Sequence, residues 1–136
     1  MSNIVKIDVE IRDEAALISA AERIGLVKVE KTHYRYYYPD SDKNKCDYVL
    51  ALANAQSNTY EIGVSKTKDG EKFLLAFDTH GGGYGLLAAT QNKGHGPMSR
   101  LQQHYAVEVA AKELRRNGYR VQERTNEQGE LVLVTV

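Results

Sequence analysis

The chain has 136 residues, 42% of them hydrophobic, and its 18 basic side chains balance 18 acidic ones. A chain of this length and apolar content can build a core of its own, which excludes global disorder. A net charge of zero provides no general attraction to nucleic acid or to anionic membranes, so nucleic acid is a disfavoured partner. We therefore interpret residues 1–136 as one globular domain.

The single cysteine, Cys46, excludes an intramolecular disulfide and favours a reducing compartment. Residues 1–8 alternate polar and apolar side chains, whereas a signal peptide would need a continuous apolar stretch there. No window approaches the roughly 20 apolar residues of a membrane-spanning helix. These features predict a soluble, cytoplasmic protein without a membrane partner.

The first two elements are a strand and a helix. Apolar and polar residues alternate from Ile4 to Arg12, which predicts a half-buried strand. Asp13 follows as a candidate N-cap, and Gly25 is placed to end the helix that Asp13 begins. One apolar stripe at helical spacing lies between them, formed by Leu17, Ala20, Ala21 and Ile24.

The middle of the chain predicts further strands joined by short turns. A second strand is expected from Leu26 to Tyr38, followed by a polar turn over residues 39–45. Three shorter apolar or alternating segments follow, over residues 47–53, 60–64 and 73–77. The turn between the last two is typical of a hairpin. Such short connections predict an antiparallel meander.

Residues 79–97 break this pattern, because six of the chain's 11 glycines lie there. A loop this long without regular structure is uncommon and tends to be functional or mobile. Ser99 and Gln102 then match a capping box, which predicts the start of a second helix that Gly118 closes. The buried stripe of this helix is expected at Val107, Ala110, Ala111 and Leu114.

Two more strands are predicted near the end of the sequence, over Tyr119–Arg124 and Leu131–Val136. The element order is therefore β-α-β-β-β-β-loop-α-β-β. Each helix has one apolar stripe to bury, which predicts an α+β fold: an antiparallel or mixed sheet with two helices on one face. We expect this arrangement to be ferredoxin-like and elaborated by extra strands.

The run from Gly81 to Gly85 is the sharpest local feature. Glycines let backbone N–H groups approach a phosphate closely, and several such groups together bind anions. The run lacks the Gly-Lys-Ser/Thr ending of a P-loop and the βαβ setting of a dinucleotide site, so a flexible loop is the alternative explanation. The candidate ligand-binding residues are His80, Gly81, Gly82, Gly83, Tyr84, Lys93 and His95.

The spacing of the residues gives little support for a catalytic or metal site. The candidate histidine ligands are His33, His80, His95 and His104. None forms a recognised ligand pair with another histidine, with Cys46 or with Asp78. Cys46 adjoins Lys45, but its spacing implies no partner base, so a buried thiol is favoured over a nucleophile. We predict no metal, no cofactor and no catalytic residue, and the sequence argues against an enzyme.

Four tyrosines are concentrated over residues 34–38, with His33 and Arg35 beside them. Aromatic rings alternating with basic residues can stack bases and contact phosphates, as in single-strand binders. Tyrosine is also a good strand former that suits a sheet edge or a protein interface, and the balanced net charge favours this explanation. We therefore predict that Tyr34, Tyr36 and Tyr38 share a strand face and contact a protein partner or a second copy of the chain.

Three segments share their pattern with one known family: Gln103-His104-Tyr105-Ala106, Gly118-Tyr119-Arg120-Val121 and Tyr60-Glu61-Ile62-Gly63-Val64. The matching family stretches are Gln-Arg-Tyr-Ala-like, Gly-Phe-x-Val and Tyr-Asp-Ile-Gly-Phe. The chain resembles the hypothetical chloroplast reading frame thirty-five family, which comprises small uncharacterised proteins of plastids and bacteria. This resemblance implies a small domain of unassigned role over most of the chain.

Two functional hypotheses follow. The first is a non-catalytic binding or accessory module that acts through protein partners or self-association, motivated by the tyrosines. The second is a small-molecule or nucleotide-phosphate binding protein that uses the glycine-rich loop 79–97, with Lys93 as a candidate anion contact. An enzyme ranks third.

Overall fold

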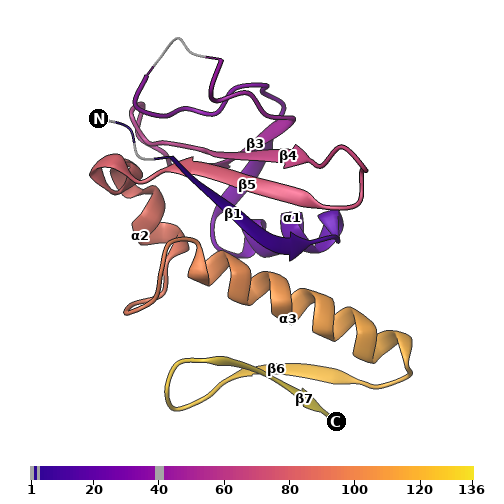
Figure 1. The fold of residues 1–136 in the computed structure, drawn as a ribbon. Helices are drawn as coiled ribbons and strands as arrows, with labels where there is room; N and C mark the ends of the chain where they lie inside the picture. Colours follow the sequence, from indigo (N-terminus) through magenta and orange to yellow (C-terminus); the bar gives the residue numbers. More distant parts are fainter. Residues whose placement is uncertain (1, 3, 39–41) are drawn as a thin grey trace.

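The computed structural model describes residues 2, 4–38 and 42–136, and it confirms the α+β class. Five strands form an antiparallel sheet in the order β1-β5-β4-β3-β2, and two more form a separate hairpin (Figure 1). The strands of the large sheet are β1 (Ile4–Ile11), β2 (Leu26–Val29), β3 (Tyr48–Leu52), β4 (Ile62–Lys66) and β5 (Phe73–Asp78). The hairpin consists of β6 (Val121–Thr125) and β7 (Leu131–Thr135).

Three helices complete the fold: α1 (Glu14–Arg23), α2 (Leu86–Thr90) and α3 (Ser99–Arg116). The long helix α3 lies between the five-stranded sheet and the hairpin, and it packs against α1 (Figure 1). Within the described part of the chain, no helix is both long enough and apolar enough to cross a membrane.

The strand order confirms the predicted meander, because β2, β3, β4 and β5 are neighbours in chain order. β1 pairs with β5 at the opposite edge from β2, so three strands separate the two strands that α1 connects. The ferredoxin-like detail is not confirmed by this order.

The opening strand and helix form as predicted. The carboxylate of Asp13 accepts a hydrogen bond from the backbone N–H of Ala16 at 3.0 Å, which satisfies one of the unpaired donors at the start of α1. Gly25 follows the helix with φ +89°, a left-handed conformation that ends helices and that glycine adopts without a Cβ clash.

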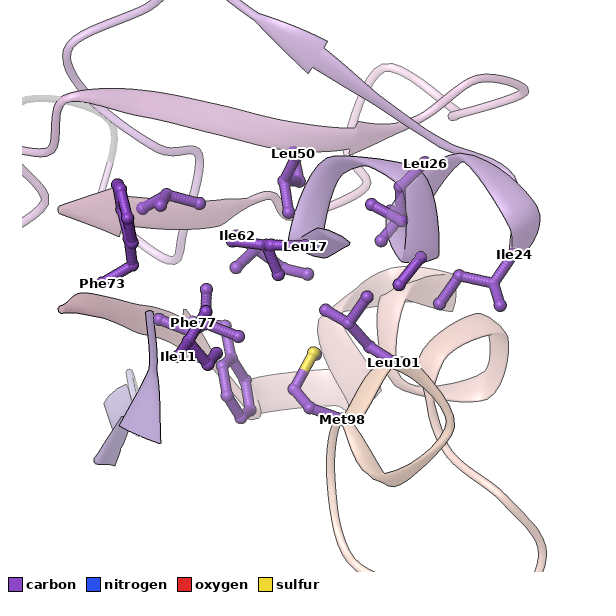
Figure 2. Packing of buried hydrophobic residues seen from close by; sticks show 14 of the residues in the cluster. Ile11, Leu17, Ile24, Leu26, Leu50, Ile62, Phe73, Phe77, Met98 and Leu101 are labelled. Atoms are coloured by element: carbon purple, nitrogen blue, oxygen red, sulfur yellow. The ribbon is translucent and has the colours of Figure 1, made fainter. Parts of the chain in front are cut away.

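The main core lies where the helices cover one face of the five-stranded sheet. Leu17 of α1 and Leu101 of α3 meet side chains of three strands, among them Leu50, Ile62 and Phe77 (Figure 2). All five of these side chains are fully buried. Because full burial of such a side chain stabilises a fold by about 1.5–3 kcal/mol, this layer fixes the helices on one face, as predicted.

Two predictions for the second long helix are wrong. The capping box does not form, because the Ser99 hydroxyl instead accepts a hydrogen bond from the backbone N–H of Asn92 at 2.8 Å. Met98 occupies the N-cap position without a side-chain cap, and its own side chain is fully buried. Ala110, which the helical spacing places in the buried stripe, is exposed and instead lines an open surface pocket with Asp13 and Glu14 at the start of α1.

The second strand is shorter than predicted, since β2 ends at Val29 and not at Tyr38. The residues that follow fold over the other face of the sheet, where Tyr34, Tyr36 and Cys46 form a second buried cluster with Val49 of β3. We call residues 30–38 and 42–47 the cover segment. Part of the predicted turn over residues 39–45 lies outside the described residues.

Candidate ligand-binding site

The cover segment rests on a glycine in the middle of the sheet. The ring of Tyr34 lies so close to Gly63 of β4 that a Cβ on Gly63 would sit 2.3 Å from Cδ1 of Tyr34. Only glycine leaves space for the ring at that position. Tyr34 is 2% exposed, and this burial raises the pKa of its phenol to about 12.

A buried carboxylate beside this ring fixes the start of the cover segment. Oε1 of Glu61 accepts hydrogen bonds from Nζ of Lys31 and from the backbone N–H of Arg35, each at 2.8 Å. The guanidinium of Arg35 donates in turn to the carbonyl of Thr59 at 3.0 Å. These bonds explain why the chain leaves the sheet edge, because they satisfy the backbone of residue 35 without a neighbouring strand.

A second buried carboxylate joins the cover segment to the glycine-rich region. Asp78, at the end of β5, is fully buried. Its two oxygens accept from the backbone N–H groups of Tyr37, at 3.1 Å, and of His80, at 2.9 Å. The same side chain therefore positions both segments that the sequence indicated as candidate sites.

The glycine-rich region begins with an ordered turn, His80–Gly85, which we call the glycine turn. Gly81, Gly82 and Gly83 have φ of 60°, 65° and 65°, so they form a left-handed helical turn. Such a turn costs non-glycine residues about 1–2 kcal/mol each, which explains the glycine run. The Gly83 carbonyl accepts from the backbone N–H of Tyr60 at 3.0 Å and holds the turn against the sheet.

Tyr84 completes the left-handed turn, with φ 51° and ψ 50°. Its carbonyl accepts from the hydroxyl of Thr59 at 3.0 Å, and its ring meets the ring of Tyr60 edge to face with centroids 5.2 Å apart. A non-glycine residue in this conformation is uncommon and is often found at functional sites. The turn thus presents the Tyr84 ring beside the cover segment.

The rings of these segments surround one pocket of about 600 Å³, which we call the tyrosine pocket. It is lined by Lys31, His33, Tyr34, Arg35, Tyr36, Tyr37, Tyr38, Asn44, Asn58, Tyr60 and Tyr84. Six of the chain's nine tyrosines are in this set. The set contains two permanently charged cations and no carboxylate, so the pocket favours a ligand with aromatic and anionic character.

Two buried polar atoms in pocket-lining residues have no hydrogen-bond partner within the described structure: the hydroxyl of Tyr36 and Oδ1 of Asn44. Tyr36 is 4% exposed and Asn44 is 5% exposed. The amide nitrogen of Asn44 is engaged, since it donates to the Tyr34 carbonyl at 2.7 Å. An unpaired buried polar group costs about 1–3 kcal/mol, so a bound molecule that reached either atom would recover this free energy.

The predicted partner-binding tyrosines need a correction. The side chains of Tyr34 and Tyr36 are buried between the cover segment and the sheet, so they offer no outer surface to a protein partner. They share no strand face either, because the strand ends before them. Tyr38 remains exposed at 49%, and Tyr37, which the sequence did not single out, makes an edge contact with His80 at 4.8 Å between centroids.

The predicted ligand-binding residues fall into two places. His80 and the residues up to Tyr84 lie at the tyrosine pocket, although only Tyr84 lines it. Lys93 and His95 instead line a separate pocket near the start of α3 and the hairpin turn. Helix α2 connects the two places (Figure 1). The structure therefore does not unite residues 80–95 as one site.

Several pocket residues carry no sequence signal. Tyr60, Asn44 and Asn58 come from separate segments, and nothing in their spacing relates them to residues 34–38. The cluster of four tyrosines was a usable indication, although the burial of Tyr34 and Tyr36 was not predictable. The glycine turn and the carboxylates of Glu61 and Asp78 help to bring the lining segments together.

The sequence also raised Cys46 as a nucleophile and several side chains as metal ligands. Cys46 is buried, as predicted, and this burial raises the pKa of its thiol to about 11, so it is protonated at neutral pH. Among the described residues, no group of three or more His, Cys, Asp or Glu side chains is arranged to hold a metal ion.

No protein-family model, curated protein or solved structure matches the chain. The resemblance to the reading frame thirty-five family consequently remains a prediction.

Proposed function

We propose that this protein is a non-catalytic binding protein, and that its tyrosine pocket holds a small planar molecule that carries a negative charge. The observation behind this proposal is the convergence of six of nine tyrosines on one pocket whose charged lining residues are all cationic. The proposal keeps the second hypothesis from the sequence and moves its site from loop 79–97 to the cover segment.

The size and lining of the pocket support this ligand class. A volume of about 600 Å³ lies within the usual range for small-molecule sites, roughly 300–1,000 Å³. Tyrosine rings stack on planar ligands and add hydroxyl groups that can hydrogen-bond at the ligand's edge. The Tyr34 ring is held against Gly63, and the two buried carboxylates bond the backbone of residues 35 and 37, so binding does not have to order this part of the pocket.

The anionic group of the ligand would meet Arg35. The ammonium of Lys31 is already paired with the buried Glu61, which leaves Lys31 less available to a ligand. Arg35 is exposed, and its Nη1 donates to the carbonyl of Thr59, so the other guanidinium donors can face a carboxylate or phosphate. His33, also exposed, lines the same pocket.

We propose a binding protein and not an enzyme because of the contacts that the possible nucleophiles make. Among the described residues at this site, the Thr32 hydroxyl lies 3.1 Å from Nδ1 of the neighbouring His33. Both residues are exposed. No carboxylate among the described residues bonds to that ring, so nothing orients it as a general base. The thiol of Cys46 is protonated and buried.

A calorimetric titration tests the proposal with three probes: adenosine monophosphate, adenosine and inorganic phosphate. The first combines a planar ring and an anion, whereas the others carry one feature each. We expect the monophosphate to bind tightest, and Arg35→Gln to weaken it about tenfold through loss of a charge-assisted hydrogen bond. Arg120→Gln, at an exposed arginine that does not line the pocket, is the matched control and should change nothing.

Two results would contradict the proposal. One is the absence of binding for the monophosphate and for two other planar anions, 4-hydroxybenzoate and naphthalene-2-sulfonate. The other is equal loss of affinity in Arg35→Gln and in Arg120→Gln, which would place the anion outside the tyrosine pocket. Saturable binding of an RNA oligonucleotide without binding of the monophosphate would favour the nucleic-acid alternative.

A further inference from the structure

The C-terminal hairpin is separated from the large sheet by α3 (Figure 1). Its two strands pair with each other and with no other strand in the described part of the chain. The two sheets therefore have four edge strands: β1 and β2 in the large sheet, β6 and β7 in the hairpin. An edge strand presents unpaired backbone groups that can join another chain.

Three of the four edge strands carry charges that discourage such pairing. β1 contains Lys6 and Glu10, β2 contains Lys28, and β6 contains Glu123 and Arg124. The remaining edge strand, β7, reads Leu-Val-Leu-Val-Thr and contains no charge, no proline and no glycine. It therefore lacks the charged, proline and glycine residues that can protect an edge strand.

The backbone hydrogen bonds show which groups of β7 are open. Val136 donates its N–H to the Arg120 carbonyl at 3.1 Å, and the Glu130 carbonyl accepts from Asn126 at 2.9 Å. In an antiparallel pair, residues bond to the neighbour at alternate positions. Positions 130, 132, 134 and 136 therefore face β6, and the N–H and C=O groups of Leu131, Leu133 and Thr135 point away from it.

The side chains of β7 divide in the same alternation. Leu133 lies opposite Glu123 of β6, and the Glu123 carboxylate forms an ion pair with Arg23 of α1. The face that contains Leu133 is thus directed toward the helices. Val132 and Val134 lie on the other face, where they pair with Arg124 and Gln122 of β6.

We infer that β7 pairs in antiparallel orientation with β7 of a second copy of this chain, around a twofold axis at Leu133. Leu133 then faces Leu133 of the second copy, and Leu131 faces Thr135 of the second copy. These are the residues whose backbone groups are open, so each such pair can exchange two hydrogen bonds. The resulting dimer has a continuous four-stranded sheet with β6 at both edges.

A second copy fits this edge better than the other strand edges of the protein do. Pairing with β1, β2 or β6 would put charged side chains opposite valine or leucine, whereas β7 against itself opposes only uncharged residues. The net charge of zero removes long-range repulsion between copies. A twofold arrangement is also the commonest form of homo-oligomer, because one patch serves both subunits.

The register of this pairing allows a specific test. Val132 would lie directly opposite Val134 of the second copy. The double variant Val132→Glu/Val134→Glu places like charges opposite each other, whereas Val132→Glu/Val134→Lys places opposite charges there. Both variants carry the same change at position 132, which lies opposite Arg124 within the hairpin, so the folding of each chain is affected similarly at that position.

Sedimentation velocity over a range of concentrations gives the result. We expect a concentration-dependent dimer for the unmodified protein, a monomer for the Glu/Glu variant and a restored, salt-sensitive dimer for the Glu/Lys variant. A monomer at every concentration of the unmodified protein, or a dimer of the Glu/Glu variant, would overturn the inference. A monomer of the folded Glu/Lys variant would overturn the register.

Thr135→Pro provides an independent variant if the charged chains fail to fold. It removes an N–H that points to the open edge, and it keeps every hydrogen bond to β6. Circular dichroism confirms the fold of each variant. Thr135→Val keeps the N–H and should dimerise like the unmodified protein, whereas a dimer of folded Thr135→Pro would contradict the proposed pairing.

Discussion

The two faces of the five-stranded sheet are covered in different ways. Helices α1 and α3 cover one face through apolar side chains such as Leu17 and Leu101. The cover segment lies over the other face without helix or strand of its own, and its tyrosines fill that space. Both faces are well buried, but the second depends on particular hydrogen bonds.

This difference shows how a segment without regular structure can be held in place. A helix satisfies its own backbone groups, so apolar contact is enough to fix it. Residues 32–34 and 44–46 of the cover segment pair with each other through two backbone hydrogen bonds. The buried carboxylates of Glu61 and Asp78 bind further N–H groups of this segment. The helix face therefore supplies stability, and the covered face supplies the position of the pocket.

The largest effect is expected from Leu17→Ala on the helix face. The leucine is fully buried, so its truncation leaves a cavity and should lower the free energy of unfolding by about 3 kcal/mol. Urea denaturation measures this loss, and Val27→Ala at a 41% exposed position is the control. The folded fraction of Leu17→Ala should bind the planar probe normally, and a weakened affinity would show that the two faces are not independent.

Gly63→Ala tests the covered face directly. The added Cβ would clash with the Tyr34 ring, and we expect a loss of about 2 kcal/mol in the free energy of unfolding together with displacement of the cover segment. The Cys46 thiol should then react faster with a thiol reagent. Gly96→Ala has open space around its Cβ and serves as control. Equal thiol rates in the two variants would disprove the Tyr34 contact.

Asp78→Asn should have a somewhat smaller effect, about 1.5 kcal/mol, because an amide can still accept one of the two backbone hydrogen bonds. Amide hydrogen exchange should accelerate at Tyr37 and His80, the two donors. The exposed Asp42→Asn is the matched control. Unchanged protection of both amides in Asp78→Asn would refute the role assigned to this carboxylate.

The smallest expected effect is a pH dependence of the free energy of unfolding, caused by Asp13 at the start of α1. The Lys112 ammonium, followed by the Ala16 N–H, holds the pKa of Asp13 below its usual value. A lowered folded-state pKa means that ionised Asp13 stabilises the protein at neutral pH and that this stability is lost as pH falls through the folded value. The side chain is 32% exposed, so solvent screens the pair and the contribution is about 0.5 kcal/mol.

Asp13→Asn keeps a side-chain cap but removes the charge. The stability difference between the unmodified protein and this variant should therefore shrink on acidification from neutral pH to about pH 3. Urea denaturation at several pH values measures it. A difference that stayed constant with pH would show that the charge of Asp13 contributes nothing.

The sequence predicted the helix face well, and the reason is physical. Period-2 and helical patterns report a side chain's direction from the local backbone, which is sufficient for Leu17 or for the Asp13 cap. The failures lie where distant residues determine the outcome. The Ser99 hydroxyl accepts a hydrogen bond from the Asn92 backbone and therefore does not cap α3. The strand β2 ends early because the backbone N–H of residue 35 donates to Glu61 and not to a neighbouring strand.

The sequence predicted only some of the residues that line the tyrosine pocket. Four tyrosines in five residues indicated a site, but the burial of Tyr34 depends on Gly63, which lies in a distant strand. The glycine run indicated an unusual backbone without revealing that its carbonyls bond to residues 59 and 60. Such contacts are properties of the assembled fold, and no local pattern contains them.

The proposed pocket is tested most directly by NMR of the tyrosine rings, since each of the nine can give its own signals. Titration with adenosine monophosphate should shift Tyr34, Tyr36, Tyr37, Tyr38, Tyr60 and Tyr84 along one saturation curve. Tyr48, Tyr105 and Tyr119, which do not line the pocket, should keep their positions. Saturable shifts confined to these three tyrosines, or no shift with any of the planar anions, would contradict the account.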